Sequence, residues 1–284
     1  AAVILLLAVG FAFLVKGADF FVEGSSSIAK KLKVPPIIIG LTIVAMGTSL
    51  PETAVSVTAS LVQNNELAVS NVVGSNIFNL MFVIGVCSIL TPIMVQKATV
   101  VRDIPLSLGC ALFLLVLGVS GLGDKAGMTL GHADGVIFLI VFAGYIFTMV
   151  RSAMKARAAG QKVEIEGVEE CDNMKELSYG KSILFLIVGA AAIAFGGDLT
   201  VDTASRIAIE LGMSQTLVGL TIVSIGTSLP ELVTSVVAAR KNEVDMAVGN
   251  AVGSNIFNIL MVLGISSAIS PVALIRENII DIVL

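Results

Sequence analysis

The sequence predicts an all-α polytopic membrane protein made of two inverted-topology repeats, and two observations lead to this fold class. The first is composition: 56% of the 284 residues are hydrophobic and 13% are charged, whereas soluble domains contain about 25% charged residues. Several apolar runs reach the roughly 20 residues that a helix needs to cross a bilayer. We therefore expect the lipid bilayer as a partner. No basic stripe with interleaved aromatic residues points to nucleic acid.

The second observation is a repeat inside the chain. Residues 40–85 and 219–264 align without a gap, and each copy contains the hexapeptide GTSLPE followed by the hexapeptide GSNIFN. Residues of the second copy follow their equivalents by 179 positions, so that Glu231 matches Glu52. Such a repeat shapes the whole architecture, because each copy is one structural unit and the units pack together.

The apolar runs, and the Pro, Gly and polar residues that separate them, predict where the helices begin and end. In the first repeat we expect helices at about 1–29, 35–62, 67–90, 104–122 and 133–150. In the second repeat we expect one from about 181, others at about 216–239 and 245–269, and a further start near 277. The domains are then a first repeat at 1–150, a mixed-charge linker at 151–178 and a second repeat at 179–284. The second repeat ends at the equivalent of Pro105 and the chain lacks an initiator Met, so we expect it to be truncated.

The two repeats are expected to have opposite orientations in the membrane. Five helices precede the second copy, and an odd number of spans makes that copy enter from the other side, as in many secondary transporters. Lys and Arg gather in the loops of one side, including 151–178, whereas the other side carries Lys125, Arg206 and Arg276. Positive charge marks the cytoplasmic side. We expect a plasma-membrane protein with its N-terminus outside, an uncleaved first helix and a cytoplasmic linker.

Two carboxylates lie in strongly apolar sequence. Glu52 falls near the middle of the 35–62 helix, and Glu231 is its equivalent in the 216–239 helix. An ionised carboxylate at this depth is costly unless it is paired, hydrated or bound to a cation, and neither range contains Lys or Arg. Inverted copies meet at the centre of the membrane, so the pair indicates a cation site. Protonated, hydrogen-bonded glutamates are the alternative.

The helices that carry these glutamates are predicted to be broken. Pro51 has no N–H, so the carbonyl of Gly47 loses its helical partner, and Pro230 has the same effect four residues after Gly226. Freed carbonyls are ligands of the kind that hard cations such as Ca²⁺ prefer. Irregular backbone at membrane depth is tolerated where it is buried or lines a cavity. We therefore expect the two broken helices at the centre of the molecule.

Further oxygen donors repeat at i, i+4 spacing, which places them on one face of a helix. They include no His or Cys cluster, which argues against zinc or copper, and no resident cofactor is expected. Small residues around them also suit close helix packing, so the serines have two interpretations. The candidate ligands from this spacing are Thr48, Glu52, Ser75, Asn79, Thr227, Glu231, Ser254 and Asn258.

Other repeated polar residues leave their role open. Asp19 and Asp198 fall late in their helices, where a structural or vestibule role is favoured. Four asparagines can bond the backbone at the edge of the site, and these are Asn71, Asn76, Asn250 and Asn255.

The two hexapeptides resemble motifs of the calcium/cation antiporter superfamily, and within it those of the prokaryotic sodium/calcium exchangers. GTSLPE at 47–52 and 226–231, with GSNIFN at 74–79 and 253–258, is similar to the two alpha-repeats of that superfamily. The resemblance covers nearly the whole chain. It implies ten helices, a cytoplasmic linker after the fifth, and central sites that Na⁺ and Ca²⁺ occupy in turn.

The resemblance also implies roles for individual residues. Glu52 and Glu231 would be ligands shared by Ca²⁺ and Na⁺, and Asn79 and Asn258 would border the central site. By this resemblance, potassium-dependent exchangers would carry an Asp where this chain has Asn258, and proton/calcium exchangers would carry a GNAVEH-type motif that this chain lacks. Both differences favour Na⁺ as the coupling ion. The other implied ligands are oxygens of Thr48 and Thr227, the hydroxyls of Ser75 and Ser254 in two outer Na⁺ sites, and the backbone carbonyls of Ala45 and Ser224.

These observations lead us to expect a monomeric, electrogenic antiporter that moves Na⁺ inward and Ca²⁺ outward. Ca²⁺/H⁺ exchange or K⁺-dependent Na⁺/Ca²⁺ exchange is the alternative. A passive cation channel is more distant, because inverted repeats with broken helices are typical of carriers. We do not expect an enzyme, since no His within the predicted spans could activate a serine.

Overall fold

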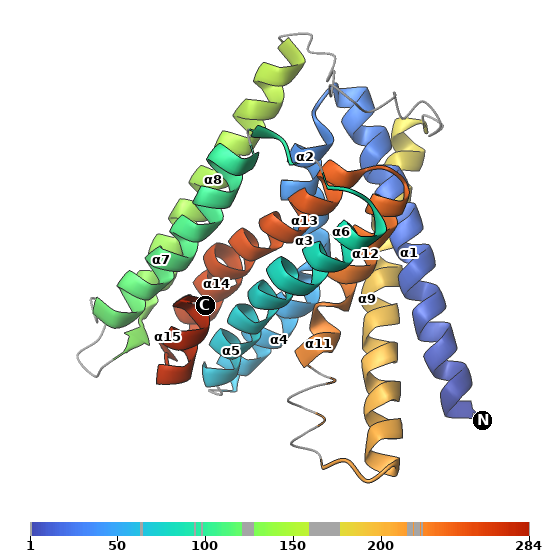
Figure 1. Cartoon of the computed structure of the whole chain (residues 1–284). Coiled ribbons are helices and arrows are strands. Elements are labelled where there is room, and N and C mark those ends of the chain that lie inside the picture. Colours follow the sequence, from blue (N-terminus) through green and yellow to red (C-terminus); the bar gives the residue numbers. More distant parts are fainter. Residues whose placement is uncertain are drawn as a thin grey trace.

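The structure, a computed structural model, describes residues 2–62, 65–93, 95–97, 99–120, 128–158, 177–214, 218, 222 and 224–283. This part of the chain is almost entirely helical (Figure 1). Six of its helices are long and apolar enough to cross a membrane. Pro36–Thr48 and Leu50–Leu61 form a further, bent span. The predicted all-α polytopic fold is confirmed.

The first repeat provides five spans. The first two are α1 (Ala2–Leu32) and a broken span of α2 (Pro36–Ile39), the π-helical turn η1 (Gly40–Val44), α3 (Ala45–Thr48) and α4 (Leu50–Leu61). The others are α5 (Asn65–Ile77), η2 (Phe78–Val83) and α6 (Ile84–Leu90); η3 (Thr99–Asp103) and α7 (Ile104–Ser120); and α8 (His132–Ala158). The π-helical turns were not predicted.

The elements of the second repeat are α9 (Tyr179–Glu210), α11 (Ser224–Thr227), α12 (Leu229–Arg240), α13 (Val244–Phe257), the π-helical turn η5 (Asn258–Val262), α14 (Leu263–Ile269) and α15 (Arg276–Val283). Three of them, α11, α12 and α14, have the same bounds as elements of the first repeat at an offset of 179 residues, and the others differ by one or more residues. α11 and α12 begin and end at the equivalents of α3 and α4. Equal sequence has therefore folded into equal local structure in both copies.

Two predicted boundaries need correction. α8 continues to Ala158, past its predicted end at Val150, because apolar and helix-favouring residues extend beyond the bilayer-length run. The fourth span begins at Thr99, ahead of the predicted residue 104, because a π-helical turn precedes α7. Three predicted segments lie wholly or partly outside the described residues. They are the end of the 104–122 helix at 121–122, residues 159–176 of the linker, and residues 216–217, 219–221 and 223 of the 216–239 helix.

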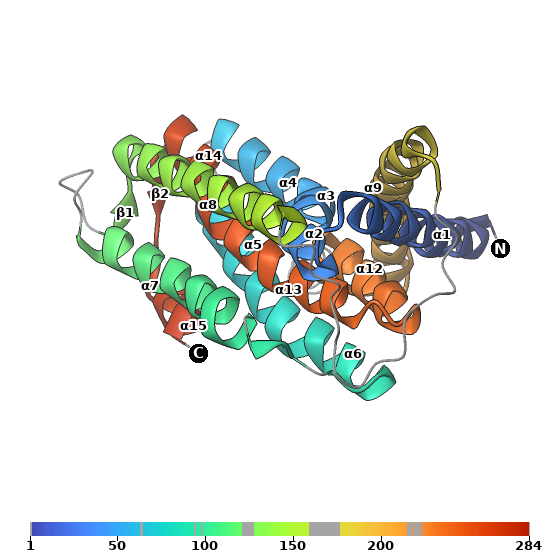
Figure 2. The ribbon, with the colours of Figure 1, turned by 90° about the horizontal axis from the view of Figure 1, so that it is seen from above.

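The core of the molecule is formed around α13 and α14. In the most apolar stretch of this span 78% of the residues are buried, against 22% to 33% in the other five spans. Figure 1 shows the spans α5–α6 and α13–α14 side by side at the centre and running in opposite directions, and Figure 2 shows other helices on several sides of α13. A short antiparallel pair of strands, β1 (Thr129–Leu130) and β2 (Val272–Ala273), joins the repeats beside this core.

α1 and α9 pack together along one flank of the molecule (Figures 1 and 2). A Cβ atom added at Gly17 would come within 2.8 Å of the backbone nitrogen of Ile193, and one at Gly189 within 2.7 Å of that of Phe21. The two backbones are therefore in direct contact, as in membrane helices that associate through small residues.

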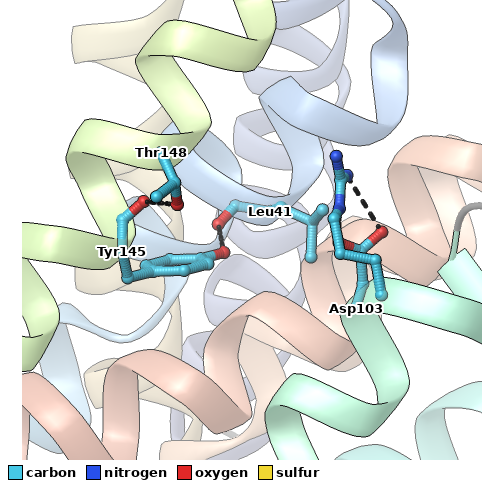
Figure 3. A network of polar contacts seen from close by, with 5 residues as sticks. Leu41, Asp103, Tyr145 and Thr148 are labelled. Atoms are coloured by element: carbon cyan, nitrogen blue, oxygen red, sulfur yellow. Dashed lines mark hydrogen bonds and ion pairs between the residues drawn. The ribbon is translucent and has the colours of Figure 1, made fainter.

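α8 holds the first broken helix through its backbone. The Tyr145 hydroxyl donates a hydrogen bond of 2.9 Å to the carbonyl oxygen of Leu41 in η1 (Figure 3). A π-helical turn disturbs the regular hydrogen-bond ladder, and the phenol gives a carbonyl in this turn a partner. Close by, Arg102 pairs with Asp103 at 2.7 Å where η3 meets α7.

Tyr145→Phe should therefore destabilise the fold. The substitution keeps the ring but leaves the buried Leu41 carbonyl without this donor, which costs about 1–3 kcal/mol. The measurement is thermal unfolding of the purified protein in detergent. Tyr179→Phe is the matched control, since the Tyr179 side chain is 53% exposed. Equal midpoints for the two variants would contradict the role given to Tyr145.

Candidate cation-binding site

Both candidate glutamates follow a break in a helix. The break after Thr48 bends the span by 47°. Ser49 at this break has φ −84° and ψ 11°, and its equivalent Ser228 has φ −93° and ψ 5°. Pro51 and Pro230 then stand near the start of the following helices, where the missing N–H is tolerated. The predicted breaks are present in both repeats.

The breaks place each carboxylate at the beginning of a new helix. Glu52 lies in the first turn of α4 and Glu231 in the first turn of α12, and both side chains are 0% exposed. Unpaired N–H groups give a helix N-terminus a partial positive charge, which favours a carboxylate there. This interaction offsets only part of the cost of burying a charge, so further partners are needed.

Serine hydroxyls from each break reach the glutamate of the other repeat. Ser49 Oγ donates to Glu231 Oε1 at 3.1 Å, and Ser228 Oγ donates to Glu52 Oε1 at 3.4 Å. The polar centre is therefore shared between the repeats.

Four buried oxygens at this centre have no hydrogen-bond partner among the described residues. They are Glu52 Oε2, Glu231 Oε2, Asn79 Oδ1 and Asn258 Oδ1. Their helices are in contact across the repeats: α4 packs against η5, which begins with Asn258, and α12 packs against η2, which contains Asn79. All four are hard oxygen ligands, and an unpaired buried polar atom is costly unless a ligand satisfies it. The arrangement is complementary to a cation.

The candidate hydroxyls surround the carboxylates. Ser254 Oγ donates to Glu231 Oε1 at 3.4 Å and lies 3.4 Å from Thr48 Oγ1, while Ser75 Oγ lies 3.0 Å from Ser228 Oγ. Thr48 Oγ1 donates to Asn250 Oδ1 at 3.0 Å. A hydroxyl has one proton and two lone pairs, so these oxygens can donate to a protein group and still face a cation.

The second threonine and the two backbone candidates are placed as follows. Thr227 Oγ1 donates to Asn71 Oδ1 at 3.3 Å, which mirrors the bond of Thr48. Ala45 and Ser224 are the first residues of α3 and α11. The Ala45 carbonyl accepts from the backbone N–H of Ser49 at 3.0 Å, and the Thr48 hydroxyl is a second donor to it at 3.3 Å.

Asn71 and Asn250 hold the glutamate-bearing helices in place. Asn250 Nδ2 donates to the carbonyl of Glu231 at 3.4 Å and to Ser235 Oγ at 2.9 Å. Asn71 Nδ2 makes the equivalent bonds to the carbonyl of Glu52 at 3.5 Å and to Ser56 Oγ at 3.0 Å. Of the two interpretations open at the level of sequence, these contacts fit backbone support.

Positive side chains do not neutralise this centre. In the described part of the chain, ion pairs join Lys16 and Lys241 to Asp19, and Arg102 to Asp103. None of them reaches either glutamate. Compensation for the two carboxylates must therefore come from bound cations or protons. Asp19 thus has a structural partner in Lys241, in keeping with the structural role favoured for it.

Sequence reasoning missed Ser49 and Ser228. It noted Asn76 and Asn255 as residues that can bond the backbone, which they do, but it did not pair them with the amides of Asn258 and Asn79. A signal was available, because all four residues lie inside the repeated hexapeptides. Repetition alone, however, does not show which residues meet across the two copies.

Comparisons with known proteins agree with one another. The family model described as "Sodium/calcium exchanger protein" matches residues 2–151 and 181–284. The sodium/calcium exchanger MaX1 of Methanosarcina acetivorans is 35% identical over 95% of this chain and 83% of its own length. The inner membrane protein YrbG of Escherichia coli is 37% identical over 94% of this chain and 79% of its own length. A structure of the sodium-calcium exchanger NCX_Mj, soaked with Na⁺ and Ca²⁺, matches with a TM-score of 0.82 and 31% identity, covering 100% of this chain and 87% of that one.

The support that Asn250 gives to α12 can be tested. Asn250→Ala should lower the free energy of unfolding by about 1–3 kcal/mol, because buried partners lose their donor. Asn71→Ala is the matched variant in the other repeat. It should cost less, because Asn71 is half-buried and water can replace its bonds. Denaturant or thermal unfolding in detergent measures both. A larger loss for Asn71→Ala would contradict this account.

Proposed function

Because the chain belongs to the sodium/calcium exchanger family, we propose that it is a secondary antiporter that exchanges Na⁺ for Ca²⁺ across a membrane. The observation that carries the proposal is the set of four buried oxygens without partners at the meeting of the two repeats. They are carboxylate and amide oxygens, the ligand types that hard cations take. MaX1 and NCX_Mj, both named as sodium/calcium exchangers, support the choice of ions.

One site serves both ions because the carboxylates are shared. Two ionised glutamates carry a charge of −2, which a single Ca²⁺ cancels. Na⁺ ions bind the same carboxylates together with the outer oxygens of Ser75 and Ser254, the threonines, and the carbonyls of Ala45 and Ser224. Full occupancy by both ions would place excess positive charge in a buried site. Each ion therefore displaces the other, which is the physical basis of exchange.

The two loaded states differ in charge when three Na⁺ replace one Ca²⁺. The Na⁺-loaded site then carries +1, whereas the Ca²⁺-loaded site is neutral. A charge that crosses the full membrane field changes its energy by about 2.3 kcal/mol per 100 mV. Exchange with this stoichiometry is therefore electrogenic.

The inverted repeats supply the two access routes. Equivalent helices of opposite orientation can open the same central site to one side or the other. The distribution of Lys and Arg in the loops supports a proposed orientation with the N-terminus outside and the linker in the cytoplasm, and we propose the plasma membrane as the location. Since one chain provides both halves of the site, a monomer is sufficient for transport.

Flux measurements with charge-neutral variants test the shared carboxylates. Proteoliposomes loaded with Na⁺ and diluted into Na⁺-free medium should accumulate ⁴⁵Ca²⁺. Glu52→Gln and Glu231→Gln should each reduce this uptake to background, because losing one partner of a buried ionic interaction costs about 3–5 kcal/mol. Glu210→Gln is the matched control, since Glu210 is exposed at the end of α9.

Three outcomes would contradict this function. Normal uptake by either central variant would exclude shared ligation. Wild-type uptake that ignores Na⁺ but follows an imposed pH gradient would assign the glutamates to H⁺. Uptake with no dependence on a counter-ion would indicate a channel. Repeating the assay with and without K⁺ distinguishes a K⁺-dependent exchanger.

The charge difference predicts a voltage effect of known sign. In Na⁺-loaded vesicles, three Na⁺ leave for each Ca²⁺ that enters, so one positive charge moves outward per cycle. A potential that is positive inside, set with K⁺ and valinomycin, should therefore accelerate ⁴⁵Ca²⁺ uptake, and a negative one should slow it. Uptake with the same initial rate at both potentials would contradict electrogenic exchange.

A further inference from the structure

We propose that Asn76 and Asn255 are positioning residues that turn the amides of Asn258 and Asn79 so that their oxygens face the transported cation. The inference rests on the proposed function and assigns it two further residues. Its basis is a pair of bonds across the repeats. Asn79 Nδ2 donates to Asn255 Oδ1, and Asn258 Nδ2 donates to Asn76 Oδ1, each at 3.1 Å. The NH₂ groups of Asn79 and Asn258 thus both donate to a residue of the opposite repeat.

The orientations of Asn76 and Asn255 are themselves fixed. Asn76 Nδ2 donates to the backbone carbonyl of Asn255 at 3.3 Å, and Asn255 Nδ2 donates to that of Asn76 at 3.2 Å. A backbone carbonyl can only accept, so these two amides must present their N–H groups to it and their oxygens elsewhere. Within the described residues, those oxygens accept from the N–H groups of Asn79 and Asn258.

These amide–amide hydrogen bonds are buried, which makes them hard to replace. Asn79 and Asn258 are fully buried and Asn255 is 2% exposed, so water is a poor substitute for the bonds. If the Asn79 amide turned over, its oxygen would face the oxygen of Asn255 and its NH₂ group would face the cation. In the observed arrangement the Oδ1 atoms of Asn79 and Asn258 have no hydrogen-bond partner in the part of the chain that the structure describes.

The orientation should matter more for Ca²⁺ than for Na⁺. The interaction of an ion with an amide dipole scales with the charge of the ion, and Ca²⁺ takes six to eight oxygen ligands. A turned amide replaces an attractive oxygen with a repulsive N–H group, at twice the cost for the divalent ion. Asn76 and Asn255 therefore act on the selectivity between the two ions.

Equilibrium binding of ⁴⁵Ca²⁺ to the purified full chain, with displacement by Na⁺, tests this role. Asn255→Leu should lower the affinity for Ca²⁺ about tenfold, the effect of one net hydrogen bond, and should lower that for Na⁺ less. A carboxylate has an oxygen at both ends and needs no orientation. In an Asn79→Asp background, Asn255→Leu should therefore have no further effect on Ca²⁺ affinity.

A crossed design separates positioning from packing. Asn255→Leu should be rescued by Asn79→Asp and not by Asn258→Asp, whereas Asn76→Leu should be rescued by Asn258→Asp and not by Asn79→Asp. Each Asp variant alone is the reference for its background. Equal losses in both backgrounds would overturn the proposal, because helix packing does not depend on which amide became a carboxylate.

Two further outcomes have separate meanings. If Asn255→Leu does not fold, the Asn76→Leu arm decides, because Asn76 is half-buried and tolerates substitution better. A wild-type chain without saturable Ca²⁺ binding that Na⁺ displaces would overturn the proposed function itself. Na⁺-sensitive Ca²⁺ binding without the crossed pattern would overturn only the positioning role.

Discussion

The structure depends on the burial of two carboxylates that form no ion pair with any positive side chain of the described residues. Glu52 and Glu231 are fully buried, and the ion pairs of the described residues lie elsewhere. The helix starts at Leu50 and Leu229 and the hydroxyls of Ser49 and Ser228 stabilise one oxygen of each. The second oxygen of each has no hydrogen-bond partner among the described residues. The breaks in the two helices bring both carboxylates to helix starts, where this burial costs less.

In the inverted repeat, each copy stabilises the buried carboxylate of the other copy. Each copy breaks its own helix and uses a buried hydroxyl at that break, Ser49 or Ser228, to bond the carboxylate of the other copy. The asparagines behave in the same way, since the bonds of Asn79 and Asn258 also cross to the opposite repeat. Neither copy could therefore form the site alone. A pair of units with opposite orientations around one site is also what alternating access requires.

Much of this could be predicted from the sequence, because its strongest signals are local or repeated. The apolar runs predicted the spans, and the duplicated GTSLPE pointed to Glu52, Glu231 and the breaks. The cross-repeat bonds of Ser49 and Asn255 could not be predicted, because a repeat shows which residues are equivalent and not which ones meet. The π-helical turns and the bond from Tyr145 to one of them could not be predicted either. The bond of Tyr145 joins residues 104 positions apart, and the hydrophobic period of a helix does not distinguish an α-helical from a π-helical turn.

An experimental structure with Ca²⁺ bound tests the central claim most directly, because anomalous scattering locates the ion. The account predicts one Ca²⁺ at about 2.3–2.6 Å, the distance typical of Ca²⁺–oxygen ligation, from Glu52 Oε2, Glu231 Oε2, Asn79 Oδ1 and Asn258 Oδ1. The anomalous peak should disappear as Na⁺ is raised. Carboxylates that bond only to each other or to water in saturating Ca²⁺, or a peak that saturating Na⁺ leaves unchanged, would contradict it.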